Sequence, residues 1–224
     1  MQGSIKLPCI QFMNIMSDIS FQQLLSEQCE VIVKKVTDDM QSDKQYSFFI
    51  NEIERIPVVH KPILYRWWFR EDSEPMLAIQ KYLDSHPEDI QMKQLFSQLE
   101  ERKFDGKKKK YYVLYFGKSN NGYRRYIQHS TGNVHISTLR RTLYGLCLTE
   151  NGEKQYLKER EEEITRMLQE CYYEWIPFDE EGKLVECVES ICIALGKYPL
   201  NVDGNPAISE QWRDYLLEKR KLKE

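Results

Sequence analysis

Four residues that could bind an anion lie in or soon after the strand-like stretch YYVLYFG. Tyr115 lies near the end of that stretch, Lys118 lies in the turn after it, and Arg125 and His129 belong to the next helical segment. Because Arg125 and His129 are four residues apart, they project from one face of a helix. A guanidinium is a rigid fork of donors shaped for phosphate oxygens, and a lysine adds a point charge beside it. The stretch therefore predicts an anion site, although solvated surface cations would give the same pattern.

Tyr115 could also take part in proton transfer. On a regular strand Tyr115 shares a face with Val113, whereas Leu114 and Phe116 lie on the other face. Nearby cations favour the phenolate, and a phenol that ionises more easily can act as a general base. A half-buried strand tyrosine that only packs in the core is the competing interpretation.

The turn between the strand and the helix adds backbone donors to this group. Asn120 or Asn121 can cap a helix that begins at Gly122. The first turn of such a helix has unpaired N–H groups, which suit an anion.

The elements that must position these residues follow from hydrophobic periodicity and from helix and turn signals. The pattern predicts a mixed α/β (α+β) fold in a single globular core. We expect helices at 20–40, in two parts of 71–105 divided at His86-Pro87, and at 122–129, 137–148, 153–170, 184–195 and 209–221, with strands at 56–69, 111–116 and 171–178.

Composition limits the classes of protein to consider. The 224 residues are 41% hydrophobic and carry a net charge of −3, so any nucleic-acid binding must come from local basic patches such as 107–110 and 219–223. Six cysteines without a Cys-x-x-Cys pair and only four histidines argue against a zinc site. Without a signal-like start or a run of 18 apolar residues, we expect a cytoplasmic protein with no membrane partner.

Two further segments complete a recognisable order of motifs. The strand ILY at 63–65 supplies Tyr65, and the stretch VESICIALGKYPLN supplies Glu189 and, twelve residues later, Asn201. Together with YFG at 115–117 and the arginine and histidine that follow it, this ordered set resembles the GIY-YIG nuclease family. The segment STLRRTL is similar to the one after the histidine in the branch that contains bacterial restriction enzymes.

The resemblance spans about 62–201 and has two departures. Ile63 replaces the glycine of the first signature tripeptide, while Leu64 and Phe116 replace isoleucines. The two tyrosines are 50 residues apart because 71–110 is inserted between them. This insert could cover the site, contact DNA or mediate dimerisation.

The resemblance implies a fold, an activity and a cofactor. The expected fold is a small three-stranded antiparallel sheet flanked by helices, with a helical insertion at about 71–110 and extra N- and C-terminal helices. Residues 1–55 would form a helical extension packed on a nuclease domain at 56–224. The expected activity is hydrolysis of a DNA phosphodiester with one Mg²⁺ or Mn²⁺ ion per active site.

The resemblance also implies a role for each site residue. Tyr65 would be the general base for the attacking water, assisted by Lys118 and Tyr115. Arg125 would stabilise charge in the transition state, and Glu189 would hold the metal ion against the leaving oxygen. The expected catalytic residues are Tyr65, Tyr115, Lys118, Arg125, His129, Glu189 and Asn201, with His129 and Asn201 orienting water or phosphate; the expected DNA contacts are Lys118, Asn120, Arg124 and Arg125.

Several positions have rivals. Glu186, one turn before Glu189, is an alternative metal ligand, and Arg124 is an alternative to Arg125 on the neighbouring helix face. Asn201 could be an ordinary turn residue. Tryptophans 67 and 68 are more typical of a core than of a platform for stacking bases.

The leading hypothesis is a metal-dependent endonuclease that acts on double-stranded DNA. A site-specific restriction enzyme is one form that such an endonuclease could take. Cutting both strands would require a homodimer or two nicks, and a restriction role would require a cognate methyltransferase. The alternatives are a repair or junction nuclease, a non-catalytic nucleic-acid-binding module that keeps the fold, and an interaction protein that uses the helices of 71–110.

Overall fold

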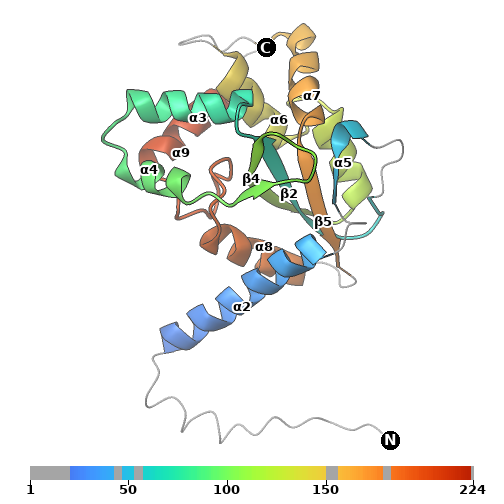
Figure 1. The fold of residues 1–224 in the computed structure, drawn as a ribbon, viewed down its shortest axis with the longest axis vertical. Coiled ribbons are helices and arrows are strands. Elements are labelled where there is room, and N and C mark those ends of the chain that lie inside the picture. Colours follow the sequence, from blue (N-terminus) through green and yellow to red (C-terminus); the bar gives the residue numbers. More distant parts are fainter. Residues whose placement is uncertain (1–20, 43–46, 53–57, 150–155, 179–182, 223–224) are drawn as a thin grey trace, which may run out of the picture.

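The computed structural model describes residues 21–42, 47–52, 58–149, 156–178 and 183–222. Its centre is an antiparallel sheet with the strand order β1-β5-β2-β4-β3 (Figure 1). The strands are β1 (Ser47–Phe49), β2 (Ile63–Arg70), β3 (Glu101–Lys103), β4 (Lys110–Ser119) and β5 (Tyr172–Pro177). The three expected strands correspond to β2, β4 and β5 at the centre of the sheet. The prediction of a three-stranded sheet was wrong in that it missed the two short edge strands, β1 and β3.

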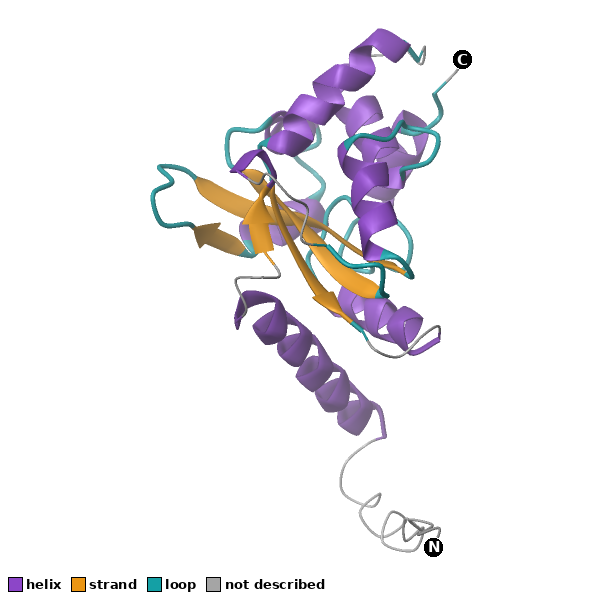
Figure 2. Ribbon diagram, turned by 90° about the vertical axis from the view of Figure 1, so that its right-hand side faces the viewer, coloured by secondary structure: helices purple, strands orange, loops and turns teal. Residues whose placement is uncertain are grey.

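Helices cover both faces of the sheet, as Figure 2 shows. One face packs against α3 (Glu74–Ser85), α4 (Ile90–Ser97), α5 (Gly122–Ser130), α6 (Thr138–Leu143), α7 (Glu161–Gln169) and α9 (Glu210–Lys219), and the other packs against α2 (Phe21–Ser42) and α8 (Lys183–Leu195). Short helical turns η2 (Ile50–Glu52), η3 (Tyr144–Leu148) and η4 (Lys158–Arg160) join these elements. No helix in the described parts of the chain is both long and apolar enough to cross a bilayer.

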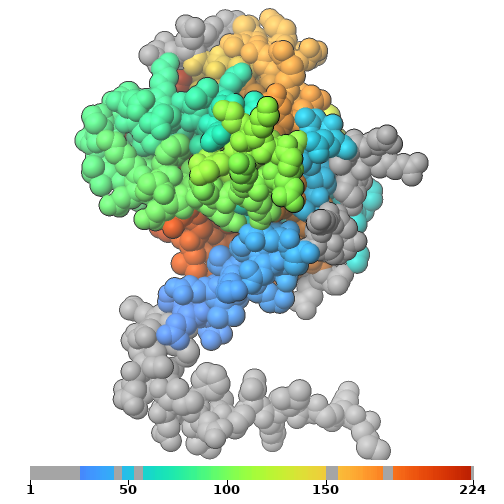
Figure 3. Space-filling view, in the orientation of Figure 1, coloured from blue at the N-terminus to red at the C-terminus, as the bar shows by residue number. Residues whose placement is uncertain are grey.

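The inserted segment contains the two expected helices, and both are anchored to the core. Asp89 begins α4 by accepting a hydrogen bond from the N–H of Met92 at 3.0 Å. The same buried carboxylate accepts a hydrogen bond from the Tyr82 hydroxyl of α3 at 2.9 Å and another from Ser209, which caps α9. Figure 3 accordingly shows the insert, in green, as a continuous part of the front surface.

The end of the insert differs from the expectation of a helix up to residue 105. Residues 101–103 form β3, which pairs with β4 and adds an edge to the sheet. Arg102 reaches from this strand to the fully buried Glu174 of β5, with 2.5 Å between Nη1 and Oε1. Arg66 binds the other oxygen of Glu174 at 2.6 Å. A buried carboxylate requires such partners, and β3 supplies one of them to Glu174.

The N-terminal part is described from residue 21 onward, so most of the expected extension at 1–55 lies outside the described residues. Helix α2 packs Val36 and Met40 against the face that carries α8. Two other boundaries differ from expectation. The strand predicted at 56–69 begins at Ile63, and the helix predicted at 153–170 begins as η4 and becomes α-helical at Glu161.

Candidate active site

An irregularity in β4 decides which face Tyr115 occupies. Trp67 of β2 pairs with Tyr115 and Trp68 pairs with Val113, which leaves Leu114 without a partner as a β-bulge. Leu114 and Tyr115 therefore lie on the same side of the sheet, and Val113 lies on the other. The prediction that Tyr115 shares a face with Val113 was wrong, because it assumed unbroken alternation. Both tryptophans are fully buried, which makes them core residues.

The bulge brings Tyr115 to the two other ring systems of the predicted site. The ring centres of Tyr65 and Tyr115 are 6.3 Å apart, and those of Tyr115 and His129 are 6.0 Å apart. Tyr65 Oη lies 2.8 Å from His129 Nε2. Tyr65 is 2% exposed and His129 is 1% exposed, so their hydrogen bond is shielded from water.

A buried serine fixes the proton position on His129. Ser137, the cap of α6, accepts the N–H of Arg140 at 3.1 Å and lies 2.7 Å from His129 Nδ1. The buried hydroxyl has one proton, and His129 Nδ1 is placed to accept it. We therefore assign Ser137 as the donor to Nδ1, which leaves the His129 proton on Nε2 and directed at the oxygen of Tyr65. Sequence reasoning missed Ser137, although a serine directly before TLRRTL is a helix-cap signal.

Burial and Arg125 together set the protonation of this cluster. Burial raises the pKa of Tyr65 and of Tyr115, and the charge of Arg125 opposes that rise. Burial lowers the pKa of His129 well below its usual range, with Arg125 acting in the same direction, so the imidazole is neutral at pH 7. Nothing in the described chain accepts a hydrogen bond from the buried Arg125 Nε. That donor is therefore left unsatisfied by the described chain.

The carboxylate of Glu189 lies beside the end of β4. Its Oε1 accepts the backbone N–H of Lys118 at 3.0 Å. Burial raises the pKa of Glu189, and the charge of Lys118 opposes the rise. The ammonium of Lys118 binds Glu186 Oε1 at 2.6 Å, and that rival carboxylate is exposed. Lys118 is thus placed between the two helix glutamates.

Asn201 holds the same strand from the other side. Its Oδ1 accepts the N–H of Phe116 at 2.9 Å, and its Nδ2 donates to the carbonyl of Phe116 at 2.8 Å. The amide thus acts as a two-point clamp on the β4 backbone, between Tyr115 and Gly117. This clamp gives Asn201 a bracing role that a simple turn residue would not have.

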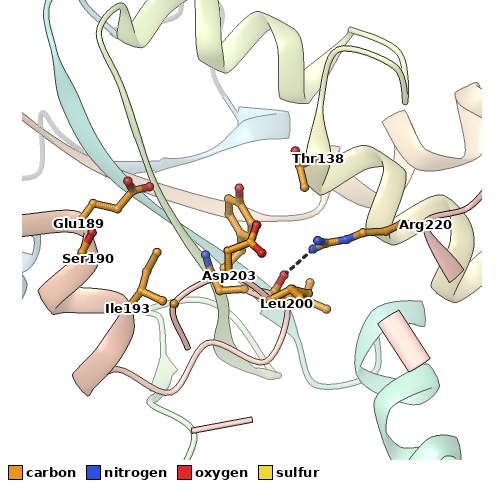
Figure 4. Close-up of a pocket in the computed structure, with 11 residues that line it drawn as sticks. Thr138, Glu189, Ser190, Ile193, Leu200, Asp203 and Arg220 are labelled. Carbon is orange, nitrogen blue, oxygen red and sulfur yellow. Dashed lines mark hydrogen bonds between the residues drawn. The ribbon is translucent and has the colours of Figure 1, made fainter. Parts of the chain in front are cut away.

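Part of this group lines a pocket of about 380 Å³, shown in Figure 4, whereas Tyr65, Lys118, Arg125 and His129 are not among its lining residues. Its lining includes Tyr115, Glu189 and Asn201 of the predicted set, together with Thr138, Asp203 and Arg220, which sequence reasoning did not select. Arg220 lies within the basic run at 219–223, a composition signal that is equally typical of a solvated surface.

The two remaining predicted DNA contacts lie outside this cluster. Asn120 and Arg124 are both exposed. Asn121, and not Asn120, caps α5, because its Oδ1 accepts the N–H of Arg124 at 2.8 Å. Arg125 faces the tyrosines from the next position, which agrees with its sharing a helix face with His129.

A comparison with models of protein families shows which family the chain belongs to. The model of the GIY-YIG catalytic domain matches residues 63–222, which is well over half of the chain. The chain belongs to the GIY-YIG family. Family membership implies a nuclease. No curated protein and no solved structure matches the chain significantly.

The GIY-YIG signature can now be explained at two glycine positions. Gly117, the last residue of the second tripeptide, faces Tyr65, and a Cβ there would lie 2.6 Å from Tyr65 Oη. The strand therefore needs a glycine to admit the tyrosine. In the first tripeptide, Ile63 stands at the position where the family has a glycine. Ile63 is fully buried and packs against Gly122 at the start of α5. The isoleucine thus fills space beside the helix that carries Arg125.

The residues of the pocket fit the divalent metal ion that GIY-YIG membership implies. Among described residues, the second oxygen of Glu189 has no hydrogen-bonding partner, and Glu189 lines the pocket. The described chain has no cluster of three or more His, Cys, Asp or Glu side chains that could enclose a metal. Mg²⁺ suits such a site, since it keeps several waters and is commonly held by one or two carboxylates plus substrate phosphates.

Proposed function

We propose that this GIY-YIG protein is a metal-dependent DNA endonuclease. The observation that carries the proposal is the proximity of three chemical functions, of which Tyr115 and Glu189 line the pocket. A tyrosine pair with a histidine partner, a guanidinium with an unused donor, and a half-buried carboxylate lie close enough to affect one another's charge. Phosphodiester hydrolysis requires a base, a rigid cation for the phosphate and an anionic ligand for a hard metal ion.

Tyr65 is the proposed general base. With its proton on Nε2, His129 would donate to Tyr65 Oη and stabilise a phenolate there, which can take the proton of an attacking water. When held by Glu189, Mg²⁺ would neutralise the leaving oxygen and add positive charge that favours ionisation of the nearby tyrosine. Tyr115 and Lys118 assist by keeping the water and Glu189 in place.

Arg125 is the proposed stabiliser of the transition state. Its charge reaches Tyr65, Tyr115, His129 and Glu189, so it lies at the centre of the group. A bound phosphate would give its buried Nε the acceptor that the described chain does not supply. Preorganised donors of this kind contribute about 3–4 kcal/mol to a transition state.

Cleavage of supercoiled plasmid in Mg²⁺ tests the proposal. We expect nicked or linear product from the wild type, none in EDTA or from Glu189→Ala, and strongly reduced product from Arg125→Ala. Arg124→Ala is the matched control, because it removes the same charge from the exposed neighbour on the same helix. Cleavage that persists in Glu189→Ala would contradict the metal role. Binding without cleavage in the wild type would instead favour a non-catalytic nucleic-acid-binding module.

The biological role is a further proposal that rests on the same experiment. Discrete linear fragments would support a site-specific restriction enzyme, acting as a homodimer with a cognate methyltransferase in the cytoplasm. Nicks or a smear with the same metal dependence would support repair or junction processing.

A further inference from the structure

Arg220 lies at the C-terminal end of α9, far along the chain from the signature motifs, yet it lines the same pocket as Tyr115 and Glu189. In Figure 4 its guanidinium and the Glu189 carboxylate lie on opposite sides of that pocket. The pocket therefore carries the Glu189 carboxylate on one side and the Arg220 guanidinium on the other, with Asp203 also in its lining.

Two hydrogen bonds from different elements hold the Arg220 side chain. Its Nε donates to the Thr142 hydroxyl of α6 at 2.7 Å, and its Nη2 donates to the carbonyl of Leu200 at 3.2 Å. Both acceptors are neutral, so the guanidinium is positioned without being neutralised. The N–H groups that these bonds do not use remain as donors along the pocket.

The absence of a carboxylate partner distinguishes Arg220 from the two fully buried arginines, Arg66 and Arg140. Arg66 is paired with Glu174 at 2.6 Å, and Arg140 is paired with Glu161 at 2.8 Å. Within the described residues no carboxylate lies within salt-bridge distance of Arg220. Burial lowers the pKa of Arg220, while the nearby Tyr115 and Asp203 oppose that shift. A largely buried guanidinium stays charged in proteins, and when it has no carboxylate partner it favours the binding of an anion.

We propose that Arg220 binds a DNA phosphate next to the scissile one, and so aligns the strand between Tyr115 and Glu189. This inference rests on the proposed nuclease function and adds a second arginine, supplied by the C-terminal helix, to the one on α5. The planar guanidinium of Arg220, held by two hydrogen bonds, matches the geometry of a phosphate group. Arg125 is proposed to bind the reacting phosphate. Arg220 is thus a positioning residue.

The salt dependence of DNA binding tests the proposal without any need for cleavage. Binding of a short duplex is measured in EDTA over a range of salt concentrations. Each lost phosphate contact lowers the slope of log K against log salt by about one. We expect that decrease in Arg220→Ala, with roughly tenfold weaker binding at about 0.1 M salt, and a wild-type slope in Arg220→Lys. A merely structural role would alter thermal stability but would leave the slope unchanged.

The control is Arg213→Ala on the same helix. Arg213 also donates to a backbone carbonyl, that of Asn205 at 3.1 Å, but it is not part of the pocket lining. An unchanged slope in Arg220→Ala, or an equal loss in Arg213→Ala, would overturn the proposal. If Arg220→Ala does not fold, Arg220→Gln is compared with Arg220→Lys, and equal slopes in these two would overturn it.

The nuclease function is judged separately. Magnesium-dependent cleavage by the wild type would leave that function standing even if Arg220 makes no phosphate contact. A wild type that neither cleaves nor binds DNA would overturn both.

Discussion

Replacing Gly117 by alanine tests whether Tyr65 works from the position that the strand gives it. An alanine Cβ would lie 2.6 Å from Tyr65 Oη and 2.7 Å from Cζ. The Cβ and the hydroxyl must separate by at least 0.4 Å to reach 3.0 Å, a distance below which Cβ contacts are essentially never found. Tyr65 has little room to move, since it is 2% exposed and its ring packs 5.5 Å from His129 and 5.8 Å from Tyr173.

The displacement affects both stability and catalysis. Overpacking of a tight core costs about 1–3 kcal/mol of unfolding free energy. The 2.8 Å bond between Tyr65 and His129 is lengthened or bent, which removes the support for the phenolate. A shift of about 1 Å in a catalytic group costs roughly 10²-fold in rate. For the smaller shift in Gly117→Ala we expect a fall in the cleavage rate of about 10- to 10²-fold.

The assay is single-turnover cleavage of supercoiled plasmid with protein in excess, beside thermal unfolding and DNA binding in EDTA. Gly106→Ala is the matched control, because Gly106 has φ +75° and no heavy atom within 4 Å of an added Cβ. That variant strains the backbone by about 1 kcal/mol without touching Tyr65. A wild-type cleavage rate in Gly117→Ala, or equal rate losses in the two variants, would refute the assignment of Tyr65 as the base.

Three further predictions concern single side chains. Glu189→Ala should abolish plasmid cleavage, whereas Glu186→Ala should change the rate by no more than a few fold; the reverse order would make Glu186 the metal ligand. Arg125→Ala should lower kcat by about 10²–10³ with little effect on duplex binding in EDTA, and a loss confined to binding would contradict its transition-state role. Because burial lowers the pKa of His129, the unfolded state binds its proton more readily. Unfolding free energy from urea titrations should therefore fall as pH drops below about 6.5, by up to roughly 1.4 kcal/mol per pH unit, and His129→Gln should lose this component.

The sequence alone predicted those features that depend on neighbours along the chain. Arg125 and His129 share a face because an α-helix brings residues four apart together, and the structure has that helix. The division of the insert into two helices follows from His86-Pro87, since the residue before a proline is held out of the helical conformation. The order of the signature residues also predicted the family, because each fragment has a fixed spacing to the next.

The tertiary structure decided the features that depend on pairing between distant segments. The bulge at Leu114 places Tyr115 beside Tyr65, although residue alternation assigns Tyr115 to the opposite face. Ser137 reaches His129, and Arg220 enters the pocket, because helices distant from the signature strands pack on the same side of the sheet. Strand register and helix packing are set by the total burial and hydrogen bonding of many segments at once. Periodicity within one segment therefore identified the residue types of the site, and packing between segments assembled them into it.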